Sequence, residues 1–428
     1  MQRKGSVMSL AAFGLFLLVA ALGVPVAHAL TFGAMAVLSM HPNLSLTIVV
    51  EQMIGQAGSF PLLAIPFFVL TGSLMLGGAL GQHLLGLLTT LLGRVHGGPG
   101  QVSVLSSTLF GGISGSAVAD AAGLGPLLIN WQKRLGYPAA FSAATLASAA
   151  TIDILLPPSI PFILYALMSN ASITALFIAG ILPGLLLCVG FTTVCYVQGR
   201  RRNFPRDTSR FAWRPFLRQL FFALPAIILP AAILVILRFG IATPTEVSVL
   251  AAFMALLFSL LLYRDLTWAR LAKAVNEAGV ATGIVLLLIM ASSVMGWVFT
   301  YEQLPAQFVQ WISGHVESPL AIILIMNLML LAVGMVIDLT AAILLFTPIL
   351  LPLAQSIGMD AVHLGVVMVV NLAIGLYTPP VGTTLFLTSA IARTSMGSVV
   401  REMGPFYAVA LLVLLLVSYV PGAIITSY

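Results

Sequence analysis

Residues 153–161 read "DILLPPSIP", and residues 375–383 read "GLYTPPVGT". Each stretch lies inside a long apolar segment and contains two adjacent prolines. A proline in a helix interior removes a backbone hydrogen bond and clashes with the preceding turn, at a cost of about 3 kcal/mol or more. The paired prolines therefore predict that both apolar segments are broken near their centres. Pro379 follows Pro157 at a distance of 222 residues.

The composition is that of a polytopic membrane protein. The chain has 428 residues, of which 60% are hydrophobic and only 7% are charged, whereas soluble domains carry about 25% charged residues. The net charge of +6 does not indicate nucleic-acid binding, because most basic residues fall in short loops, where they set topology. Cys188 and Cys195 are interpreted as small core residues.

Apolar stretches of about 20 residues predict membrane crossings. The N-terminal stretch has a basic start and an Ala27-His28-Ala29 sequence, as a cleaved signal peptide would. Its apolar character continues to Met40, which favours an uncleaved first span bent at Pro25. Simple crossings are predicted at about 7–40, 59–80, 173–198, 219–238, 244–263, 279–300 and 404–426.

Two further apolar segments, 100–132 and 318–356, are interrupted by "GGISGSAVAD" and "GMVIDLTAA". The loop 198–218 contains seven arginines and is predicted to be cytoplasmic. Counting crossings from this loop places both ends of 100–132 in the cytoplasm and both ends of 318–356 outside. Each segment is therefore predicted to be a re-entrant hairpin, and the two enter from opposite faces. The same count predicts a cytoplasmic N-terminus and a periplasmic C-terminus.

The 222-residue shift that superposes the proline pairs also aligns other residues, which indicates an internal repeat. It pairs Pro126 with Pro348, Gly112 with Gly334, Gly136 with Gly358, and Pro183 with Pro405. Because the loop charges invert the second copy, the sequence predicts an all-α membrane protein built from inverted repeats, the architecture of secondary transporters.

The predicted organisation has two halves and a linker. The first repeat, 1–197, holds the first span, an arm helix at 44–56, a span, the hairpin 100–132, the broken helix 138–168 and the span 173–198. The linker is 198–218. The second repeat, 219–428, holds an extra span at 219–238, an arm helix at 266–278, the hairpin 318–356, the broken helix 361–392 and the final span 404–426.

The four breaks are the predicted binding site. Irregular backbone inside a bilayer is tolerated only where it is buried in protein or lines a cavity. Half-helix N-termini attract anions, and freed carbonyls bind cations. The candidate residues are Ser114, Gly115, Ser116, Asp120, Thr151, Asp153, Pro157, Pro158, Ser159, Gly334, Asp338, Thr340, Asn371, Thr378, Pro379, Pro380, Gly382, Thr383 and Thr384.

Oxygen ligands suit hard cations. A coupling Na⁺ is expected near Ser114, Ser116, Asp338, Thr340 and Thr378. Capping of the broken helix ends is the alternative role for the serines and threonines. An ionised side chain in a membrane costs about 2.5–3.5 kcal/mol and is usually functional, so the three aspartates are the stronger candidates. Their alternative role is a hydrogen bond to a hairpin backbone.

The stretches "SGSAVADAAGLG", "LLPPSIPFILYA", "GMVID" and "IGLYTPPVGTTLF" resemble the large, dicarboxylate-type M subunit of tripartite ATP-independent periplasmic (TRAP) transporters. The resemblance covers essentially the whole chain. It implies a bacterial inner-membrane protein that takes up small organic anions, usually carboxylates, with Na⁺ and by an elevator motion. It also implies a small four-helix membrane subunit and a periplasmic substrate-binding protein as partners. Neither an enzyme activity nor an organic cofactor is implied.

One position departs from the family pattern. Asp153 stands where members usually carry glycine or another small residue, and its counterpart in the second repeat is Gly375. The added carboxylate could move the coupling ion toward H⁺, or it could bond to the neighbouring break. The four-helix partner is expected as a separate chain, because the first span begins within ten residues of Met1.

Three other functions are alternatives to this one. The first is a stand-alone Na⁺- or H⁺-coupled anion symporter from another inverted-repeat elevator family. The second is a membrane enzyme, which the scattered histidines do not favour. The third is a non-transporting scaffold subunit. No arginine lies at any of the four breaks. A carboxylate would have to be held by helix N-termini, hydroxyls and bound cations.

Overall fold

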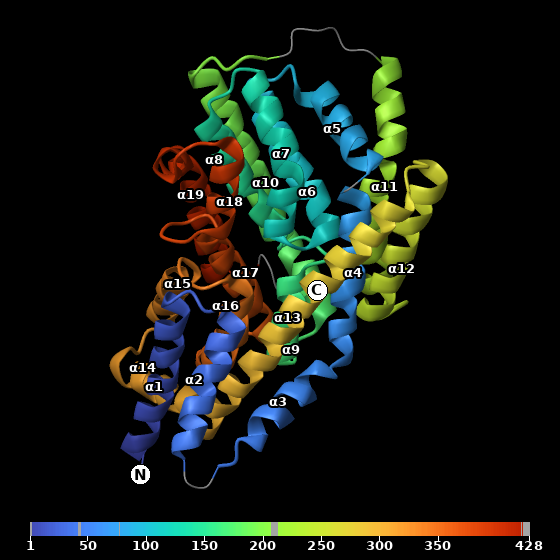
Figure 1. Ribbon diagram of the computed structural model, residues 1–428. Coiled ribbons are helices and arrows are strands. Elements are labelled where there is room, and N and C mark those ends of the chain that lie inside the picture. The colour runs from blue at the N-terminus through green and yellow to red at the C-terminus, as the bar shows by residue number, and fades with distance from the viewer. Residues whose placement is uncertain (1, 42–43, 77, 207–212, 421, 423–428) are drawn as a thin grey trace.

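The computed structural model describes residues 2–41, 44–76, 78–206, 213–420 and 422, and it is built from helices (Figure 1). The first half contains α1 (Gln2–Ala21), α2 (Val26–Met40), α3 (Thr47–Ala57), η1 (Phe60–Leu63), α4 (Ala64–Leu76), α5 (Ala79–Leu92), α6 (Gly98–Ser114), α7 (Ala117–Arg134), α8 (Ala139–Ala149), η2 (Ala150–Ile152), α9 (Ile160–Ser169) and α10 (Ile173–Arg201).

The second half contains α11 (Trp213–Arg238), α12 (Pro244–Leu257), η3 (Phe258–Leu262), α13 (Trp268–Tyr301), α14 (Leu304–His315), α15 (Pro319–Gly334), α16 (Leu339–Ser356), α17 (Ala361–Gly375), α18 (Thr383–Ala392) and α19 (Met396–Tyr419). Within the described residues, six helices are long and apolar enough to cross a membrane. The bent pair formed by α3 and the η1–α4 helix is a seventh candidate.

The helix bounds repeat along the chain. Moving α7 by 222 residues gives 339–356, which are the bounds of α16. The same shift carries α6, α8, α9 and α10 onto α15, α17, α18 and α19 to within four residues at each end. Helices α1 and α2 fall on α11 and α12. The segment 219–238, expected to be an extra span, is therefore the counterpart of the N-terminal helix.

Both predicted hairpins are present as contacting helix pairs, α6–α7 and α15–α16. They enter the molecule from opposite ends, and their tips turn near its middle (Figure 1). Both predicted helix breaks are also present. The chain leaves the α-helix at the end of α8 and re-enters at α9, and it does the same between α17 and α18. The Pro157–Pro158 and Pro379–Pro380 bonds are cis.

The prediction of a single span at 7–40 is wrong. Gly23, at a φ of 87°, and Pro25 end one helix and start another. Helices α1 and α2 pack side by side and run in opposite directions (Figure 1). As a result, the N-terminus and the end of α2 lie at one end of the molecule, while the described flanks of the arginine-rich linker lie at the other. The predicted cytoplasmic positions of the N-terminus and the linker therefore cannot both hold.

The two arm segments also differ from each other. The first arm, α3, is bent by 59° from the helix that follows it. The second arm is continuous with its span in the 34-residue helix α13, whereas separate elements at 266–278 and 279–300 were expected. The difference follows from local sequence, because Gly58 and Pro61 interrupt the first copy. The predicted span 59–80 ends at Leu76, and a separate helix, α5, follows.

Candidate functional site

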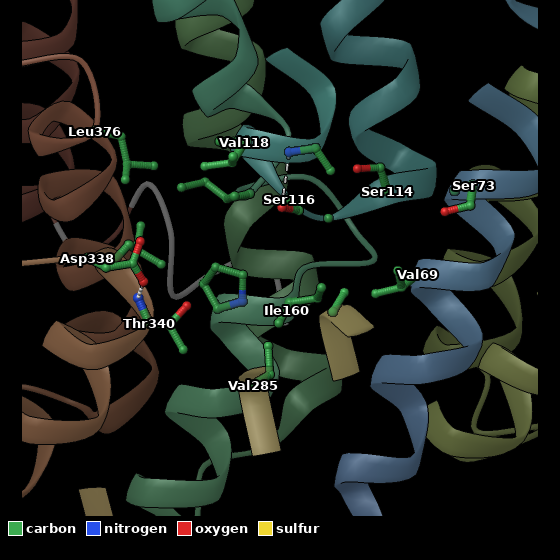
Figure 2. A pocket seen from close by; sticks show the side chains of 18 of the residues that line it. Val69, Ser73, Ser114, Ser116, Val118, Ile160, Val285, Asp338, Thr340 and Leu376 are labelled. Atoms are coloured by element: carbon green, nitrogen blue, oxygen red, sulfur yellow. Dashed lines mark hydrogen bonds between the residues drawn. The ribbon is translucent and has the colours of Figure 1, made fainter. Parts of the chain in front are cut away.

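A cavity of about 190 Å³ lies where the two hairpin tips meet the broken helices. It is also lined by α4 and α13, so helices outside the hairpins form part of its wall (Figure 2). The lining residues are Val69, Gly72, Ser73, Leu76, Ser114, Gly115, Ser116, Ala117, Val118, Ala119, Ile154, Ile160, Pro161, Ala281, Val285, Asp338, Leu339, Thr340 and Leu376.

Three helices begin at this cavity. Residues from the first turns of α7, α9 and α16 all line it. Each N-terminus leaves backbone N–H groups without helical partners and carries the positive end of the helix dipole. Three such ends around one cavity form an environment that favours an anion.

Each of the three N-termini has a side-chain cap. The Ser116 hydroxyl accepts a hydrogen bond from the N–H of Ala119 at 3.4 Å, and Ser159 caps α9 in the same way. The Asp338 carboxylate accepts from the N–H of Thr340 at 3.0 Å. Capping, the alternative role for the serines, is therefore present in the structure. Because a cap engages only one N–H group, the remaining N–H groups of the first turn stay available to a ligand.

The charge of the cavity is unusual for an anion site. Among the described residues that line it, Asp338 is the one charged side chain, and there is no lysine or arginine. Asp338 and Thr340 lie on one side of the cavity, Ser116 above it, and Val69 and Ser73 on the far side (Figure 2). A bound carboxylate would therefore face the Asp338 carboxylate, and a cation bound to Asp338 would reduce the repulsion between them.

A second, much smaller cavity lies behind Asp338. Its volume is about 10 Å³, and it is lined by 334–338, Leu376 and 381–383. Such a volume suits a single water molecule or ion. The buried hydroxyl oxygen of Thr383 has no hydrogen-bond partner among the described residues. Asp338 lines both cavities. It therefore borders the larger cavity, which has room for a small organic anion, and the smaller one, which has room for a single cation.

Asp153 is buried at the tip of the first hairpin and lines neither cavity. Its carboxylate accepts hydrogen bonds from the Ser114 hydroxyl at 3.0 Å, the Gly115 N–H at 3.0 Å and the Ser116 N–H at 3.1 Å. Of the two roles considered for this added carboxylate, the structure shows the bond to the neighbouring break.

The equivalent contact in the second half has no side chain. A Cβ added to Gly375 would lie 2.4 Å from the carbonyl carbon of Gly334, so the two backbones touch. The tip is also bonded directly to the second break, because the N–H of Val381 donates to the carbonyl of Met335 at 3.2 Å. Only glycine fits at position 375.

Several of the predicted polar residues lie outside both cavities. The hydroxyls of Thr151 and Thr378 donate to the carbonyls of Ser148 and Ile374. Thr384 bonds in the same way to Leu376. The amides of Asn371 and Asn327 are bonded to each other. Asp120 is fully buried inside the first hairpin, and neither proline pair lines a cavity.

The face of α4 that lines the cavity was not among the predicted site residues. Gly72 allows α4 to approach the hairpin closely, because a Cβ there would lie 3.1 Å from the Cα of Ser114. Ser73 places a hydroxyl beside it. The sequence signal that could have identified this face of α4 is the presence of small and polar residues, Gly72 and Ser73, within an otherwise apolar span. Such residues are also common at helix–helix contacts, which makes the signal weak.

The comparisons with known proteins agree on one family. A family model for the "Tripartite ATP-independent periplasmic transporter, DctM component" matches residues 13–423. The chain is 35% identical over 408 residues to the 2,3-diketo-L-gulonate TRAP transporter large permease protein YiaN of Escherichia coli, covering 95% of each chain. It is also 35% identical to the sialic acid TRAP transporter large permease protein SiaM of Vibrio cholerae, over 93% of each.

Among solved structures, the fold is similar to that of the Alcanivorax borkumensis YdaH transporter. The TM-score is 0.66 at 16% sequence identity, and the match covers 97% of this chain and 98% of that one. Large permeases of the matched family transport organic acids and work with a binding protein and a small membrane subunit. They are inner-membrane permeases rather than enzymes. The chain belongs to the DctM family, the large membrane component of TRAP transporters.

Proposed function

We propose that this chain takes up a small organic anion of the carboxylate class by Na⁺-coupled secondary transport. The observation that carries the proposal is the convergence of three helix N-termini on one cavity whose described lining has no basic side chain. Such a cavity can hold a carboxylate through backbone N–H groups and hydroxyls. The relatives named for 2,3-diketo-L-gulonate and sialic acid transport support this substrate class.

Na⁺ is the coupling ion that we favour, and its proposed position is the small cavity behind Asp338. The residues there offer a carboxylate, the unpartnered Thr383 hydroxyl and backbone carbonyls, and such oxygen ligands suit a hard cation. Because Asp338 borders both cavities, a cation behind it would lower the cost of bringing an anion to its other side. Binding of the two ligands would then be cooperative.

The transport step that we propose is an elevator motion. The hairpins and broken helices would move together, and α4, α13 and the first arm would form the scaffold. Support comes from the wall of the cavity, to which both of these groups of helices contribute. We place the arginine-rich linker in the cytoplasm by its charge.

We also propose that the chain acts with two separate partners, a small four-helix membrane subunit and a periplasmic binding protein that delivers the substrate. The alternative is a stand-alone Na⁺- or H⁺-coupled symporter, for which the likeness to YdaH gives only a shared fold. Reconstitution distinguishes the two. The large chain is placed in proteoliposomes alone, with the small subunit, and with both partners, under an inward Na⁺ or choline gradient.

The probes are radiolabelled succinate, N-acetylneuraminate and 2,3-diketo-L-gulonate. We expect one of them to accumulate only when all three proteins and the Na⁺ gradient are present. Asp338→Asn should abolish this accumulation, while Glu277→Gln, on the exposed face of the second arm, should not change it. Uptake by the large chain alone would favour the stand-alone symporter. Equal uptake in choline would exclude Na⁺ as the coupling ion.

A further inference from the structure

The first hairpin contains a stripe of buried polar side chains that the proposed transport site does not use. Ser103 and Ser107 lie one turn apart on α6, and both are completely buried. Gln132, on the facing helix α7, donates to the Ser103 hydroxyl at 2.6 Å. Asp120 lies nearer the tip on α7, where Asp153 holds the turn.

Several atoms of this stripe have no hydrogen-bond partner among the described residues. They are both carboxylate oxygens of Asp120, the hydroxyl of Ser107 and the side-chain carbonyl of Gln132. Asp120 has 0% of its surface exposed, and Ser107 on the facing helix interacts with it. An ionised carboxylate without partners in such a place would be very costly, whereas a neutral carboxylic acid would not.

The corresponding positions in the second hairpin show that the stripe is not needed to build this fold. The residues 222 positions after Ser103, Ser107, Ser114, Asp120, Gln132 and Asp153 are Ile325, Met329, Val336, Ala342, Ala354 and Gly375. All six are apolar or glycine, and α15 and α16 pack together without polar groups at these places. The first hairpin therefore carries polar chemistry that its structural counterpart does without.

Asp120 and Asp153, the two buried carboxylates of this region, are both bonded to Ser116: the Asp120 N–H donates to the Ser116 carbonyl at 2.9 Å, and the Ser116 N–H donates to the Asp153 carboxylate at 3.1 Å. Two carboxylates buried at close range cannot both be ionised without strong repulsion, so such pairs commonly share one proton. Asp153 accepts three hydrogen bonds, which stabilise its charge, while Asp120 accepts none at bonding distance from the described residues. The proton therefore belongs on Asp120.

We propose that the first hairpin binds one proton at the Asp120–Asp153 pair and that Ser107, Ser103 and Gln132 mark its route from the linker end of the molecule. The proton comes from bulk water and converts the Asp120 carboxylate to a neutral acid. Gln132 and Ser103 lie toward the start of α6, where the carbonyl of Pro99 is within 3.4 Å of the Gln132 amide. The unpartnered atoms between the two ends are suitable partners for bridging water.

The elements that pack around Asp120 and Asp153 contain few other side chains that could bind the proton instead. Helices α6 and α8 and the turn η2 carry none. Helix α10 contributes Cys188 and Cys195, which lie beside Thr108 and Thr145 rather than beside the pair. Helix α5 contributes His83, which is bonded to Gln219, and the arginines of α11 lie near the two ends of that helix. The basic residues of α7 are confined to its last turn. A Na⁺ ion is less suitable here, because it needs several oxygen ligands at once and the Asp153 oxygens are already engaged by donors.

The occupied site would keep the hairpin tip closed over Asp153. Loss of the proton places a second negative charge against Asp153, which repels the carboxylate that holds Ser114, Gly115 and Ser116. Because these tip residues line the larger cavity, the protonation state of Asp120 would affect that cavity from behind. The proton site does not depend on which ion drives transport.

Infrared spectroscopy of the purified full chain in nanodiscs tests this proposal. We expect a protonated carboxylic-acid band at neutral pH that shifts in D₂O and persists when choline is replaced by Na⁺. Asp120→Asn should remove the band, and Glu277→Gln, an exposed arm residue, should retain it. The absence of the band, or its persistence in Asp120→Asn, would overturn the proposal.

Loss of the band on addition of Na⁺ would also overturn it, and would instead indicate a cation site. If Asp120→Asn fails to fold, Ser107→Ala provides a milder test, because it removes only the adjacent hydroxyl. In that variant the band should move in frequency while the helical content stays unchanged. A band at its original frequency would show that the protonated group does not lie beside Ser107 and would contradict the proposal.

Discussion

The tips of the two hairpins occupy equivalent places in the repeat but are held in opposite ways. In the first half, the Asp153 carboxylate fills the contact and accepts three hydrogen bonds from the tip. In the second half, Gly375 lets the backbone touch Gly334 directly, and an ion-sized cavity lies beside it. The two copies of the inverted repeat therefore share one backbone arrangement but differ in what fills it. The first copy contains the Asp153 carboxylate, and the second contains a cavity of the size of an ion.

The two tips and the helix breaks beside them also differ in solvent exposure. Pro157 and Pro158 are buried within the protein. In the second half, Val336 at the tip and Val381 after the break are 56% and 47% exposed. The first tip is thus held by the buried carboxylate of Asp153, while the second lies closer to the surface. We therefore expect the second tip to depend more on a bound ligand.

The largest expected effect comes from giving the second half the residue of the first. Gly375→Asp would place a side chain 2.4 Å from the Gly334 backbone and would bury a carboxylate without the donors that Asp153 has. Overpacking and an unpartnered buried charge should together cost more than about 3 kcal/mol. Size-exclusion chromatography after expression should show little monodisperse protein. Gly283→Ala, where a Cβ meets nothing within 4 Å, should express normally.

The reverse exchange should be milder. Asp153→Gly leaves one hydroxyl and two N–H groups at the first tip without an acceptor. Hydrogen bonds to a charged acceptor contribute about 1.5–3 kcal/mol each, and removal of a buried charge offsets part of the loss. We expect a net destabilisation of about 3 kcal/mol and a lower melting temperature. Asp153→Asn keeps one acceptor oxygen and should fall between Asp153→Gly and wild type. An unchanged melting temperature in both variants would show that the contact does not hold the tip.

The caps of the two tips allow a more even comparison, because Asp338 stands 222 residues after Ser116. Asp338→Ala should cost about 1 kcal/mol through loss of its 3.0 Å bond to Thr340. Ser116→Ala should cost about 0.5 kcal/mol, because its bond to Ala119 is longer, at 3.4 Å. Thermal denaturation of the two variants in the same detergent checks the order. A larger loss of stability in Ser116→Ala than in Asp338→Ala would show that Ser116, rather than Asp338, is the stronger cap.

The smallest effect is expected at the surface contact between α10 and α19, which are themselves equivalent helices. Arg202 donates two hydrogen bonds to Glu402, at 2.6 and 3.0 Å, but the two side chains are 36% and 23% exposed. Exposed ion pairs contribute less than about 1 kcal/mol. Glu402→Gln should therefore shift the melting temperature only slightly, and raising the salt concentration should remove the difference. A shift as large as that of Asp153→Gly would contradict this ranking.

The hairpins and helix breaks could be predicted from the sequence because their signals are local and repeated. Paired prolines forbid a continuous helix wherever they occur, and the 222-residue shift required the same break twice. The first span was mispredicted because an uninterrupted apolar stretch does not reveal whether the chain continues in one direction or folds back on itself. Gly23 and Pro25 were read as a bend, whereas α1 and α2 fold back on each other.

The candidate site was only partly predictable. Ser114, Ser116, Asp338 and Thr340 line the cavity because tip residues of crossing hairpins must meet near the middle. The partners of the other polar residues depend on which helix faces which, and hydropathy does not contain that information. Thr378, for example, lines neither cavity, and its hydroxyl donates to the carbonyl of Ile374.

The central claim is that the second half binds the coupling cation while the first half holds its tip with its own carboxylate. Melting temperatures measured in Na⁺ and in choline, for wild type, Asp153→Asn and Asp338→Asn, test it most directly, because a ligand that binds only the folded state raises its stability. We predict that Na⁺ stabilises wild type and Asp153→Asn and has no effect on Asp338→Asn. Equal stabilisation of Asp338→Asn, or its loss only in Asp153→Asn, would contradict the claim.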